Sequence, residues 1–593
     1  MVETINQLFL NTVRTYAKPD LLTYKAGGRY EALSSDEVGL RVRRLALGLS
    51  ALGCRPGDKV ALLADNGPWW IMADFAIQSL GAVTVPIYPT LVADQINFII
   101  GHSEAAVVLC SSPALWSKVD AGRPGLAGVR AFVVFYDDAP AGAVALKDVL
   151  ARGAAADAAD PGRFEAGALA VNPGDLASII YTSGTTGVPK GVMLSHANFI
   201  SNIRTMAEIV AFGHPDVVLL FLPLSHVLAR MTTWSFIYKG CTIAFAESVE
   251  TVAENLLEVK PHIMVSVPRL FEKLYAKIMD NVLLGSSLKR KIFAWALRVG
   301  SEAGHRSLEH RPVPAGLRIR KRLARKLVFS KILVKTGGRI RFFVSGGAPL
   351  SREIADFFYA IGLVVLEGYG LTETAPVLAV NTFENVRFGT VGKVTPGVSV
   401  KIAPDGEILA KGPNVMSGYF RNETETREAF DAEGWFHTGD IGHLDADGFL
   451  VITDRKKDLL VTAGGKNIAP QPIENALRQN PYIANALVVG SRRKFVSALI
   501  VPNLEKLADL ARQRQIAFTR PAELTARDDI RAFVLDEIDR ATPGLAPYEK
   551  IKKIVLLDRD FELEREELTP TLKIRRSKVE EKFKDLIDAL YVE

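Results

Sequence analysis

The sequence predicts an α/β protein built from more than one domain, and three observations lead to this prediction. Helical and strand patterns alternate through residues 1–170, as in a parallel sheet that helices cover. The chain has 593 residues, which is too many for one hydrophobic core. Hydrophobic residues make up 48% of the chain and charged residues 23%, so the composition is that of an ordinary globular protein.

The alternation can be followed element by element. Apolar positions at helical spacing predict helices over residues 34–52, 69–80 and 93–102. Short apolar runs predict strands over 59–64, 82–87 and 105–109, and further strands over 176–180, 217–222, 449–452, 486–489 and 496–501. The alanine-rich stretch 151–160 is expected to be a connector without a chemical role.

Net charge and cysteine content indicate which partners and which cellular compartment to expect. A net charge of +6 is too small an excess to indicate nucleic acid as a partner. Cys54, Cys110 and Cys241 are widely spaced in apolar surroundings, which favours buried free thiols in a reducing compartment. The first residues lack the order of a signal peptide, and apolar runs stay well short of about 18 residues. We therefore expect a cytoplasmic protein.

A glycine-rich loop over residues 181–191, with the sequence YTSGTTGVPKG, follows the strand predicted over 176–180. Glycines let backbone N–H groups turn inward around an anion, hydroxyl groups add donors, and Lys190 adds a positive charge. The loop therefore suits a polyphosphate. It differs from a Walker loop, because Gly191 rather than Ser or Thr follows the lysine. The alternative is a flexible surface loop, which the strand before it disfavours.

Six further segments place polar residues at strand ends or turns. They are LPLSHVLAR (222–230), SGGAPL (345–350), EGYGLTET (367–374), GWFHTGD (434–440), DRKKD (454–458) and LTPTLKIRR (568–576). Polar groups just past the C-terminal end of a strand lie where open α/β sheets bind ligands. Tyr369 offers a flat face for a purine, and Glu373 is a hard oxygen ligand suited to Mg²⁺.

Together these segments resemble the motifs of the adenylate-forming superfamily, which includes acyl-CoA synthetases, luciferases and peptide-synthetase adenylation domains. The motifs stand in the family's order, and the resemblance covers nearly the whole chain. It implies a large N-terminal AMP-binding domain of helix-covered sheets over residues 1–453. It also implies a small mobile α+β domain over 454–593, with a hinge at 454–458.

The resemblance also implies roles for individual residues. Lys573, Thr185 and Glu373 are expected to serve adenylation, the last two as Mg²⁺ ligands. Nucleotide contacts are expected from Thr182, Ser183, Gly184, Thr185, Thr186, Gly187, Lys190, Gly346, Gly347, Ala348, Pro349, Glu367, Gly368, Tyr369, Gly370, Thr372, Asp440, Arg455 and Lys457. His226 and Trp234 are expected near the acyl group, and Gly464, Gly465 and Lys466 near CoA. Taken alone, His226 is more often a structural residue and Trp234 a core residue.

The activity implied is activation of a carboxylic acid by ATP through an acyl-adenylate, with release of pyrophosphate and AMP. The second and last motifs and the basic segment described next resemble long-chain acyl-CoA synthetases, so the expected substrates are a long-chain fatty acid, ATP with Mg²⁺, and CoA. A medium-chain or aryl acyl-CoA ligase, or a fatty-acyl-AMP ligase acting on a carrier protein, would share most motifs. A non-catalytic nucleotide- or lipid-binding protein is a further alternative, which intact Lys190, Glu373, Asp440, Arg455 and Lys573 disfavour.

A basic segment lies within about residues 280–335. Between Lys289 and Lys331 it has thirteen Lys or Arg and two Glu, interleaved with Ile292, Phe293, Trp295, Leu297, Leu323, Leu327 and Phe329. A basic helix with an apolar face can lie on an anionic bilayer. We therefore expect peripheral membrane contact, with a solvated basic surface as the alternative. The oligomeric state stays open, a dimer included.

Overall fold

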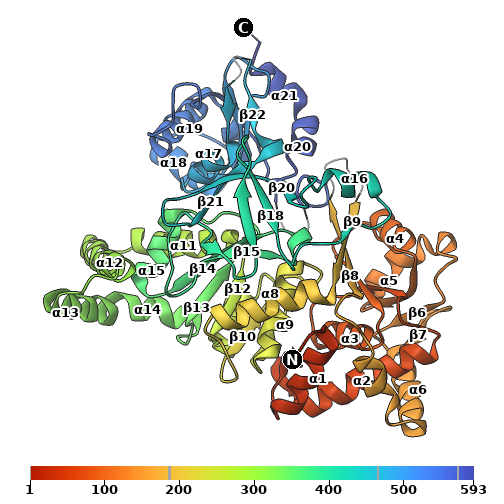
Figure 1. Cartoon of the computed structure of the whole chain (residues 1–593). Coiled ribbons are helices and arrows are strands. Elements are labelled where there is room, and N and C mark those ends of the chain that lie inside the picture. The colour runs from red at the N-terminus through yellow and green to blue at the C-terminus, as the bar shows by residue number, and fades with distance from the viewer. Residues whose placement is uncertain (1, 184–188, 464–465, 570–572, 593) are drawn as a thin grey trace.

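The computed structural model describes residues 2–183, 189–463, 466–569 and 573–592. Figure 1 shows a small C-terminal domain, in blue, seated on the sheets of a large N-terminal domain. The buried apolar side chains follow this division, because one group of clusters lies within residues 5–450 and another within 460–587. The fold class predicted from the sequence is confirmed. The boundary at 453/454 stays a prediction.

One sheet of the large domain brings two of the predicted loops together. Its strands run in the order β16 (Lys393–Val394), β15 (Val377–Val380), β14 (Val364–Gly370), β13 (Phe342–Ser345), β12 (Ile263–Ser266), β10 (Val217–Leu220), β11 (Thr242–Phe245), β1 (Leu22–Ala26) and β2 (Arg29–Leu33). From β14 to β1 the neighbours pair in parallel, with Ser345 opposite Glu367. Parallel strands end at the same edge, so the segments that follow β13 and β14 are neighbours.

A second sheet carries the glycine-rich loop. Its strands run in the order β19 (Gly418–Tyr419), β9 (Pro189–Ser195), β8 (Leu176–Ser183), β4 (Val83–Ile87), β3 (Lys59–Leu63), β5 (Ala105–Cys110), β6 (Ala131–Val134) and β7 (Val144–Ala145). The strands from β8 to β7 pair in parallel, which confirms the prediction for this region. Helices α2 (Ser35–Ala51), α3 (Pro68–Ser79) and α4 (Ala93–His102) lie where the sequence predicts them.

A third, antiparallel sheet lies directly below the small domain in Figure 1. Its strands run in the order β17 (Ser399–Ile402), β18 (Glu407–Lys411), β20 (Phe436–Leu444) and β21 (Leu450–Arg455). Asp440 lies opposite Arg455 in the β20–β21 pairing. This register brings the predicted ribose ligand and the first predicted hinge residues onto one edge.

The remaining helices cover these sheets. In the large domain they are α1 (Ile5–Thr15), α5 (Pro113–Asp120), α6 (Leu146–Ala159), α7 (Arg163–Leu169), α8 (His196–Ile209), α9 (Val227–Tyr238), α10 (Val252–Val259), α11 (Pro268–Leu283), α12 (Ser287–Leu308), α13 (Ala315–Ala324), α14 (Ser330–Leu333), α15 (Arg352–Ile361) and α16 (Glu423–Glu428). Ser195 caps α8 with its side chain, and Asn198 returns the bond, which fixes the start of this helix right after β9.

The alanine-rich stretch 151–160 is not a connector, so this prediction was wrong. Residues up to Ala159 belong to helix α6, which packs closely on α2. A Cβ added at Gly153 would lie 1.8 Å from the Arg44 carbonyl oxygen, so the helix backbones nearly touch. Alanine is the best helix former, and small residues allow this approach. They add little apolar volume, so the periodicity is weak in the sequence.

The small domain has its own sheet and core. Strands β24 (Ile483–Val489), β25 (Val496–Pro502) and β26 (Ile551–Leu556) form the sheet, and β22 (Leu460–Val461) pairs with β23 (Asn467–Ile468). The helices are α17 (Pro470–Leu477), α18 (Leu504–Gln513), α19 (Asp528–Ala541), α20 (Arg576–Lys582) and α21 (Lys584–Ala589). Arg576 on α20 binds the buried carboxylate of Glu474 on α17 at 2.6 Å, which ties the C-terminal helices to this core.

The basic segment forms α12, α13, a π-helical turn over Arg325–Phe329, and α14. Phe293 and Phe329 are buried against the large domain, so they do not belong to an exposed apolar face as the sequence suggested. Within the residues that the structure describes, every helix is too short or too polar to cross a bilayer. Cys54, Cys110 and Cys241 are buried free thiols, as predicted.

Candidate active site

Strands β8 and β9 hold the two ends of the glycine-rich loop. They pair antiparallel, with Thr182 opposite Lys190 and Ser183 opposite Pro189. Residues Gly184, Thr185, Thr186 and Gly187 lie outside the described residues, so their predicted roles stay predictions. Lys190 is ion-paired with Glu425, and its ammonium lies 5.6 Å from the centre of the Tyr419 ring.

Glu373 lies at the same corner of the site as Lys190. The Tyr419 hydroxyl donates a 3.0 Å hydrogen bond to Oε1 of Glu373, and burial raises the pKa of this phenol above its usual range. Tyr419 and Glu425 therefore support two predicted residues, although the sequence analysis missed both. No local motif marks either one. Only the antiparallel pairing of β19 with β9 places Tyr419 here, next to Val192.

The segments after β13 and β14 form a pair of neighbouring loops. Gly347 has a φ of +82°, a conformation that side chains with a Cβ rarely adopt. A Cβ at Gly370 would lie 1.6 Å from the Pro376 carbonyl oxygen, so only glycine fits. Ala348 and Pro349 belong to the loop after β13, Gly368 and Gly370 lie at the end of β14, and Thr372 follows that strand. These positions permit the close backbone approach that a flat base requires.

Glu367 supports the loop after β13 through a buried hydrogen bond. It is 6% exposed, and its Oε1 accepts a 3.0 Å hydrogen bond from the Leu350 N–H. Burial raises the pKa of its carboxyl to about 8, so the group is mainly protonated at neutral pH. A direct nucleotide contact of Glu367 stays a prediction.

Asp440 joins two other predicted residues. The Tyr369 hydroxyl donates to its Oδ2 at 2.8 Å, and Arg455 Nε donates to its Oδ1 at 2.9 Å. Asp440 is 3% exposed, so these bonds hold a nearly buried carboxylate. Burial and the adjacent carboxylate raise the pKa of Tyr369 far above its usual range, and Asp440 raises that of Arg455. The structure thus brings EGYG, TGD and DRKKD together.

His226 begins helix α9. Its Nδ1 accepts a 3.2 Å hydrogen bond from the Leu228 N–H, so the neutral ring carries its proton on Nε2. Burial and the positive charge of Lys573 lower the pKa of His226 to about 4, which keeps the ring neutral at physiological pH. His226 can therefore act as a hydrogen-bond donor but not as a cation.

Lys573 of the small domain lies near these residues, because its charge interacts with His226, Arg455 and Asp440. Its side chain is partly exposed to solvent. The surrounding protein nevertheless desolvates the ammonium group, and this desolvation together with the positive charge of Arg455 lowers its pKa to about 8. Asp440 opposes this shift, and Lys457 adds to it. Lys457 is exposed, and desolvation and Arg455 lower its own pKa. Positive charges therefore repel one another at this site, and a bound anion would relieve that repulsion.

Four of the five residues predicted near the acyl group or CoA are placed elsewhere or lie outside the described residues. Gly464 and Gly465 lie outside the described residues. The Lys466 ammonium lies 5.9 Å from the Tyr548 ring, on the small domain. Trp234 is fully buried, with the Arg230 guanidinium 4.5 Å from its ring centre and Phe199 packed against its edge. This packing makes Trp234 a core residue, and its role in acyl binding stays a prediction.

The collected geometry suits a nucleotide that carries a reactive phosphate. A flat phenol and glycine loops lie beside a carboxylate that can accept hydrogen bonds, and lysines approach from both domains. Glu373 supplies a hard oxygen atom of the kind that Mg²⁺ prefers, and its second predicted partner, Thr185, is outside the described residues. Within the described part of the chain, no group of three His, Cys, Asp or Glu is placed to hold a metal.

Comparison with known proteins agrees with the nucleotide-binding geometry described above. The family described as "AMP-binding enzyme" matches residues 12–420, and "AMP-binding enzyme C-terminal domain" matches residues 457–593. The chain is 38% identical over 590 residues to long-chain-fatty-acid–CoA ligase FadD15 of Mycobacterium bovis, covering 97% of this chain and 95% of the relative. It is 32% identical to peroxisomal long chain acyl-CoA synthetase 6 of Arabidopsis thaliana, covering 95% and 82%.

Solved structures share the fold. The anthranilate CoA ligase AuaEII in complex with anthranoyl-AMP superimposes with a TM-score of 0.74 at 20% identity, covering 99% of this chain and 98% of that one. ATP-bound MatB from Rhodopseudomonas palustris gives 0.69 at 24% identity, covering 98% and 99%. With both domain families matched in order and one relative aligned over nearly its full length, this chain belongs to the AMP-binding enzyme family.

Proposed function

We propose that this protein is a long-chain fatty acid–CoA ligase. It activates a long-chain fatty acid with ATP, forms an acyl-adenylate and pyrophosphate, and transfers the acyl group to CoA with release of AMP. The observation that carries this proposal is that the charge of Lys573 interacts with those of Asp440 and Arg455, which places a small-domain cation near the predicted nucleotide site. The names of the relatives support the choice of substrate.

The first half-reaction requires a carboxylate oxygen to attack the α-phosphorus of ATP. Both reactants are anions, so the site must neutralise charge and hold them in line. In this proposal Asp440 accepts hydrogen bonds from the ribose hydroxyls, Tyr369 stacks on the adenine, and Lys573 bridges the carboxylate and the α-phosphate. Glu373 would hold the Mg²⁺ of Mg-ATP, and this ion would supply positive charge to the leaving phosphates.

His226 has a separate task near the acyl carboxylate. Because its ring stays neutral, with its proton on Nε2, it can donate a hydrogen bond without adding another cation to the site. We propose that Thr182, Ser183 and Lys190, at the two ends of the glycine-rich loop, hold the pyrophosphate end of ATP. Lys190 would have to exchange its Glu425 partner for phosphate, which is a stronger anionic acceptor.

The second half-reaction needs a different face of the small domain. We propose that residues 454–458 act as the hinge and that rotation brings Lys466 and its neighbours toward CoA. In the present arrangement Lys456 binds Asp405 at 2.7 Å and Glu407 at 2.8 Å, on strand β18 of the large domain or beside it. These bonds must break for rotation about this hinge. The Lys456 and Asp405 side chains are each about half exposed, so breaking that pair costs about 1 kcal/mol. Glu407 is 4% exposed, but it keeps the His437 ring and the Gly439 N–H as partners when Lys456 leaves.

The substrate assignment can be tested directly by product analysis. Purified protein is given ATP, Mg²⁺, CoA and an equimolar mixture of acetate, octanoate, benzoate, coumarate and palmitate, and the acyl-CoA products are quantified by mass spectrometry. Palmitoyl-CoA should dominate, since each buried methylene contributes about 0.8 kcal/mol. Octanoyl- or benzoyl-CoA as the main product would refute the long-chain assignment. Acyl-adenylate without any acyl-CoA would indicate a ligase that acts on a carrier protein.

We also propose that helix α13 contacts an anionic membrane from which the fatty acid is drawn. Ile319, Leu323 and Leu327 are four residues apart and 47–58% exposed, so they form an apolar stripe. Basic residues surround this stripe, and Leu284 and Leu288 near the start of α12 are 88% and 66% exposed. Figure 1 shows both helices projecting from one side of the large domain, away from the small domain. Apolar groups framed by cations match an anionic lipid surface.

Vesicle binding tests the membrane contact. Wild-type protein should sediment with phosphatidylglycerol vesicles and much less with phosphatidylcholine vesicles. Leu323→Glu combined with Leu327→Glu should abolish sedimentation without changing activity on dispersed substrate. Leu169→Glu, at an exposed leucine on α7, is the matched control and should bind as wild type. Wild-type protein that sediments with neither vesicle type would refute the membrane contact.

A further inference from the structure

The backbone around Lys573 is held by pairing on both sides of the lysine. Leu568 pairs with Ile574 in an isolated antiparallel bridge. The Thr569 N–H donates to the Lys573 carbonyl at 2.7 Å, and the Lys573 N–H donates to Thr569 Oγ1 at 3.1 Å. The position of the lysine therefore depends on what holds the base of this pairing, meaning residues 567 and 575, which lie just outside the Leu568–Ile574 bridge.

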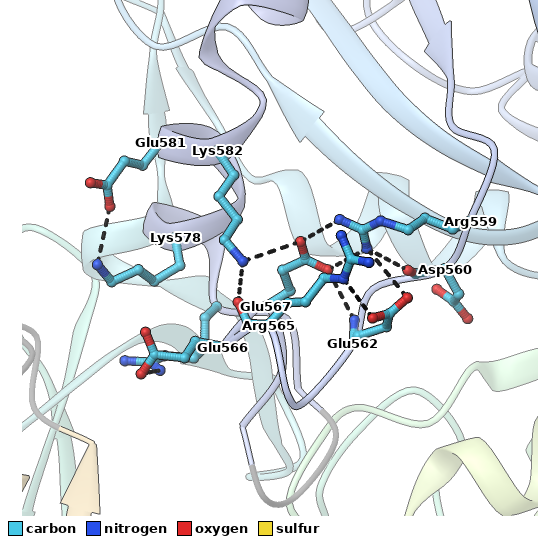
Figure 2. A network of polar contacts seen from close by, with 10 residues as sticks. Arg559, Asp560, Glu562, Arg565, Glu566, Glu567, Lys578, Glu581 and Lys582 are labelled. Atoms are coloured by element: carbon cyan, nitrogen blue, oxygen red, sulfur yellow. Dashed lines mark hydrogen bonds and ion pairs between the residues drawn. The ribbon is translucent and has the colours of Figure 1, made fainter. Parts of the chain in front are cut away.

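Glu567 lies at that base. Its side chain is fully buried, and its carboxylate receives both terminal nitrogens of Arg559, at 2.6 and 2.7 Å. Lys582 on α20 approaches to 3.5 Å, and the Glu562 N–H donates at 3.0 Å. Figure 2 shows the Glu567 carboxylate between Arg559 and Lys582, with dashed lines to both. The cations lower the pKa of Glu567, so it is ionised at neutral pH.

The backbone of Glu567 connects the chain before Lys573 to the chain after it. Its carbonyl accepts a 2.8 Å hydrogen bond from the Arg575 N–H, which lies two residues after Lys573. Its own N–H donates to the Glu562 carbonyl at 3.1 Å. One residue thus fixes the chain before Lys573, the chain after it, and the start of the segment that follows β26.

A buried ion pair is a costly way to stabilise a fold, because apolar packing of similar size is often as good or better. What a bidentate arginine–carboxylate pair offers is direction, since two parallel hydrogen bonds fix both position and angle. A catalytic cation needs that accuracy, and displacements near 1 Å cost about a hundredfold in rate. This contrast indicates a task beyond stability.

We propose that Glu567 is a positioning residue that sets Lys573 for adenylate formation through its grip on Arg559 and on the backbone of Arg575. The proposal rests on the function proposed above, in which Lys573 serves only the first half-reaction. Glu567 should therefore matter for adenylation and be dispensable for acyl transfer to CoA, when the small domain has turned and Lys573 is no longer in use.

The test compares the two half-reactions in Glu567→Gln. Gln keeps the shape of the side chain but loses the charge, so Arg559 and Lys582 are left with a weaker partner. The adenylation half-reaction is measured as pyrophosphate release. Its kcat should fall about 10–100-fold, while its KM for ATP should change less than about threefold. Conversion of supplied palmitoyl-AMP and CoA to palmitoyl-CoA should stay within about twofold of wild type. Glu562→Gln, in the same network but 40% exposed, is the matched control and should leave both rates unchanged.

Arg559→Lys gives an independent measurement if Glu567→Gln does not fold, as judged by its thermal unfolding midpoint. Lysine keeps the charge but cannot form the bidentate pair, so the same selective loss of adenylation is expected. Unchanged adenylation in the folded variants, or equal losses in both half-reactions, would overturn the positioning role. Wild-type protein that forms no acyl-adenylate from any carboxylic acid would instead overturn the proposed function.

Discussion

Raising the pH should weaken capture of ATP by this enzyme well below the pH at which an ordinary lysine titrates. Desolvation and Arg455 lower the pKa of Lys573 to about 8. Only the protonated lysine can neutralise a carboxylate and a phosphate. A group whose pKa is lowered loses its proton as the pH rises through that value, so the active form disappears above about pH 8.

The size of the effect follows from the shifted pKa. With a pKa of about 8, roughly nine-tenths of Lys573 is protonated at pH 7 and roughly one-tenth at pH 9. The rate constant kcat/KM for ATP, which reports the free enzyme, should therefore fall about tenfold between these two values. Bound ATP raises the pKa of the lysine because its phosphates are anionic, so kcat at saturating ATP should fall much less.

The assay is the initial rate of pyrophosphate release from pH 6.5 to 9.5, with both ATP and palmitate at concentrations far below their KM, so that the free enzyme is the species that titrates. Lys573→Arg should be slower but level across this range, since an arginine stays protonated. A wild-type profile that is level to pH 9.5 would refute the lowered pKa. A decline that persists in Lys573→Arg would assign the titration to another group.

Three further perturbations test other parts of the molecule. Lys573→Ala should reduce adenylation by about a thousandfold, as expected for loss of about 4 kcal/mol of charge interaction, yet still convert supplied acyl-AMP to acyl-CoA; equal loss of both rates would contradict the assigned role. Asp440→Asn should weaken ATP binding about 10–100-fold in calorimetric titrations, because charged hydrogen bonds contribute about 1.5–3 kcal/mol, and unchanged affinity would exclude ribose recognition by Asp440. Gly153→Ala should lower the free energy of unfolding by about 1–3 kcal/mol in urea titrations, since its Cβ would meet the Arg44 carbonyl, whereas Gly167→Ala, in open space, should not lower it.

The local chemistry of this site could be predicted from the sequence because it resides in short contiguous segments. The glycine-rich loop, EGYGLTET and GWFHTGD each combine their ligands within about ten residues. The glycine-rich loop follows a strand that the apolar pattern also marks, whereas EGYGLTET overlaps the end of β14 and GWFHTGD overlaps the start of β20, a strand that was not predicted. Parallel pairing then brings β13 and β14 to one edge without further information. For the same reason the α/β class and the helices α2 to α4 follow from periodicity alone.

Other features depend on residues far apart in the chain, and only the tertiary structure decided them. Tyr419 reaches Glu373 because β19 joins β9, and Glu567 reaches Lys582 because α20 folds back over the lysine segment. Stretch 151–160 became a helix because α2 offers a surface that small residues fit. The lowered pKa of Lys573 arises first from desolvation by the protein around it and then from the positive charge of Arg455, and both depend on the folded arrangement. Short motifs determine which groups are present, and long-range packing determines their partners and their charge.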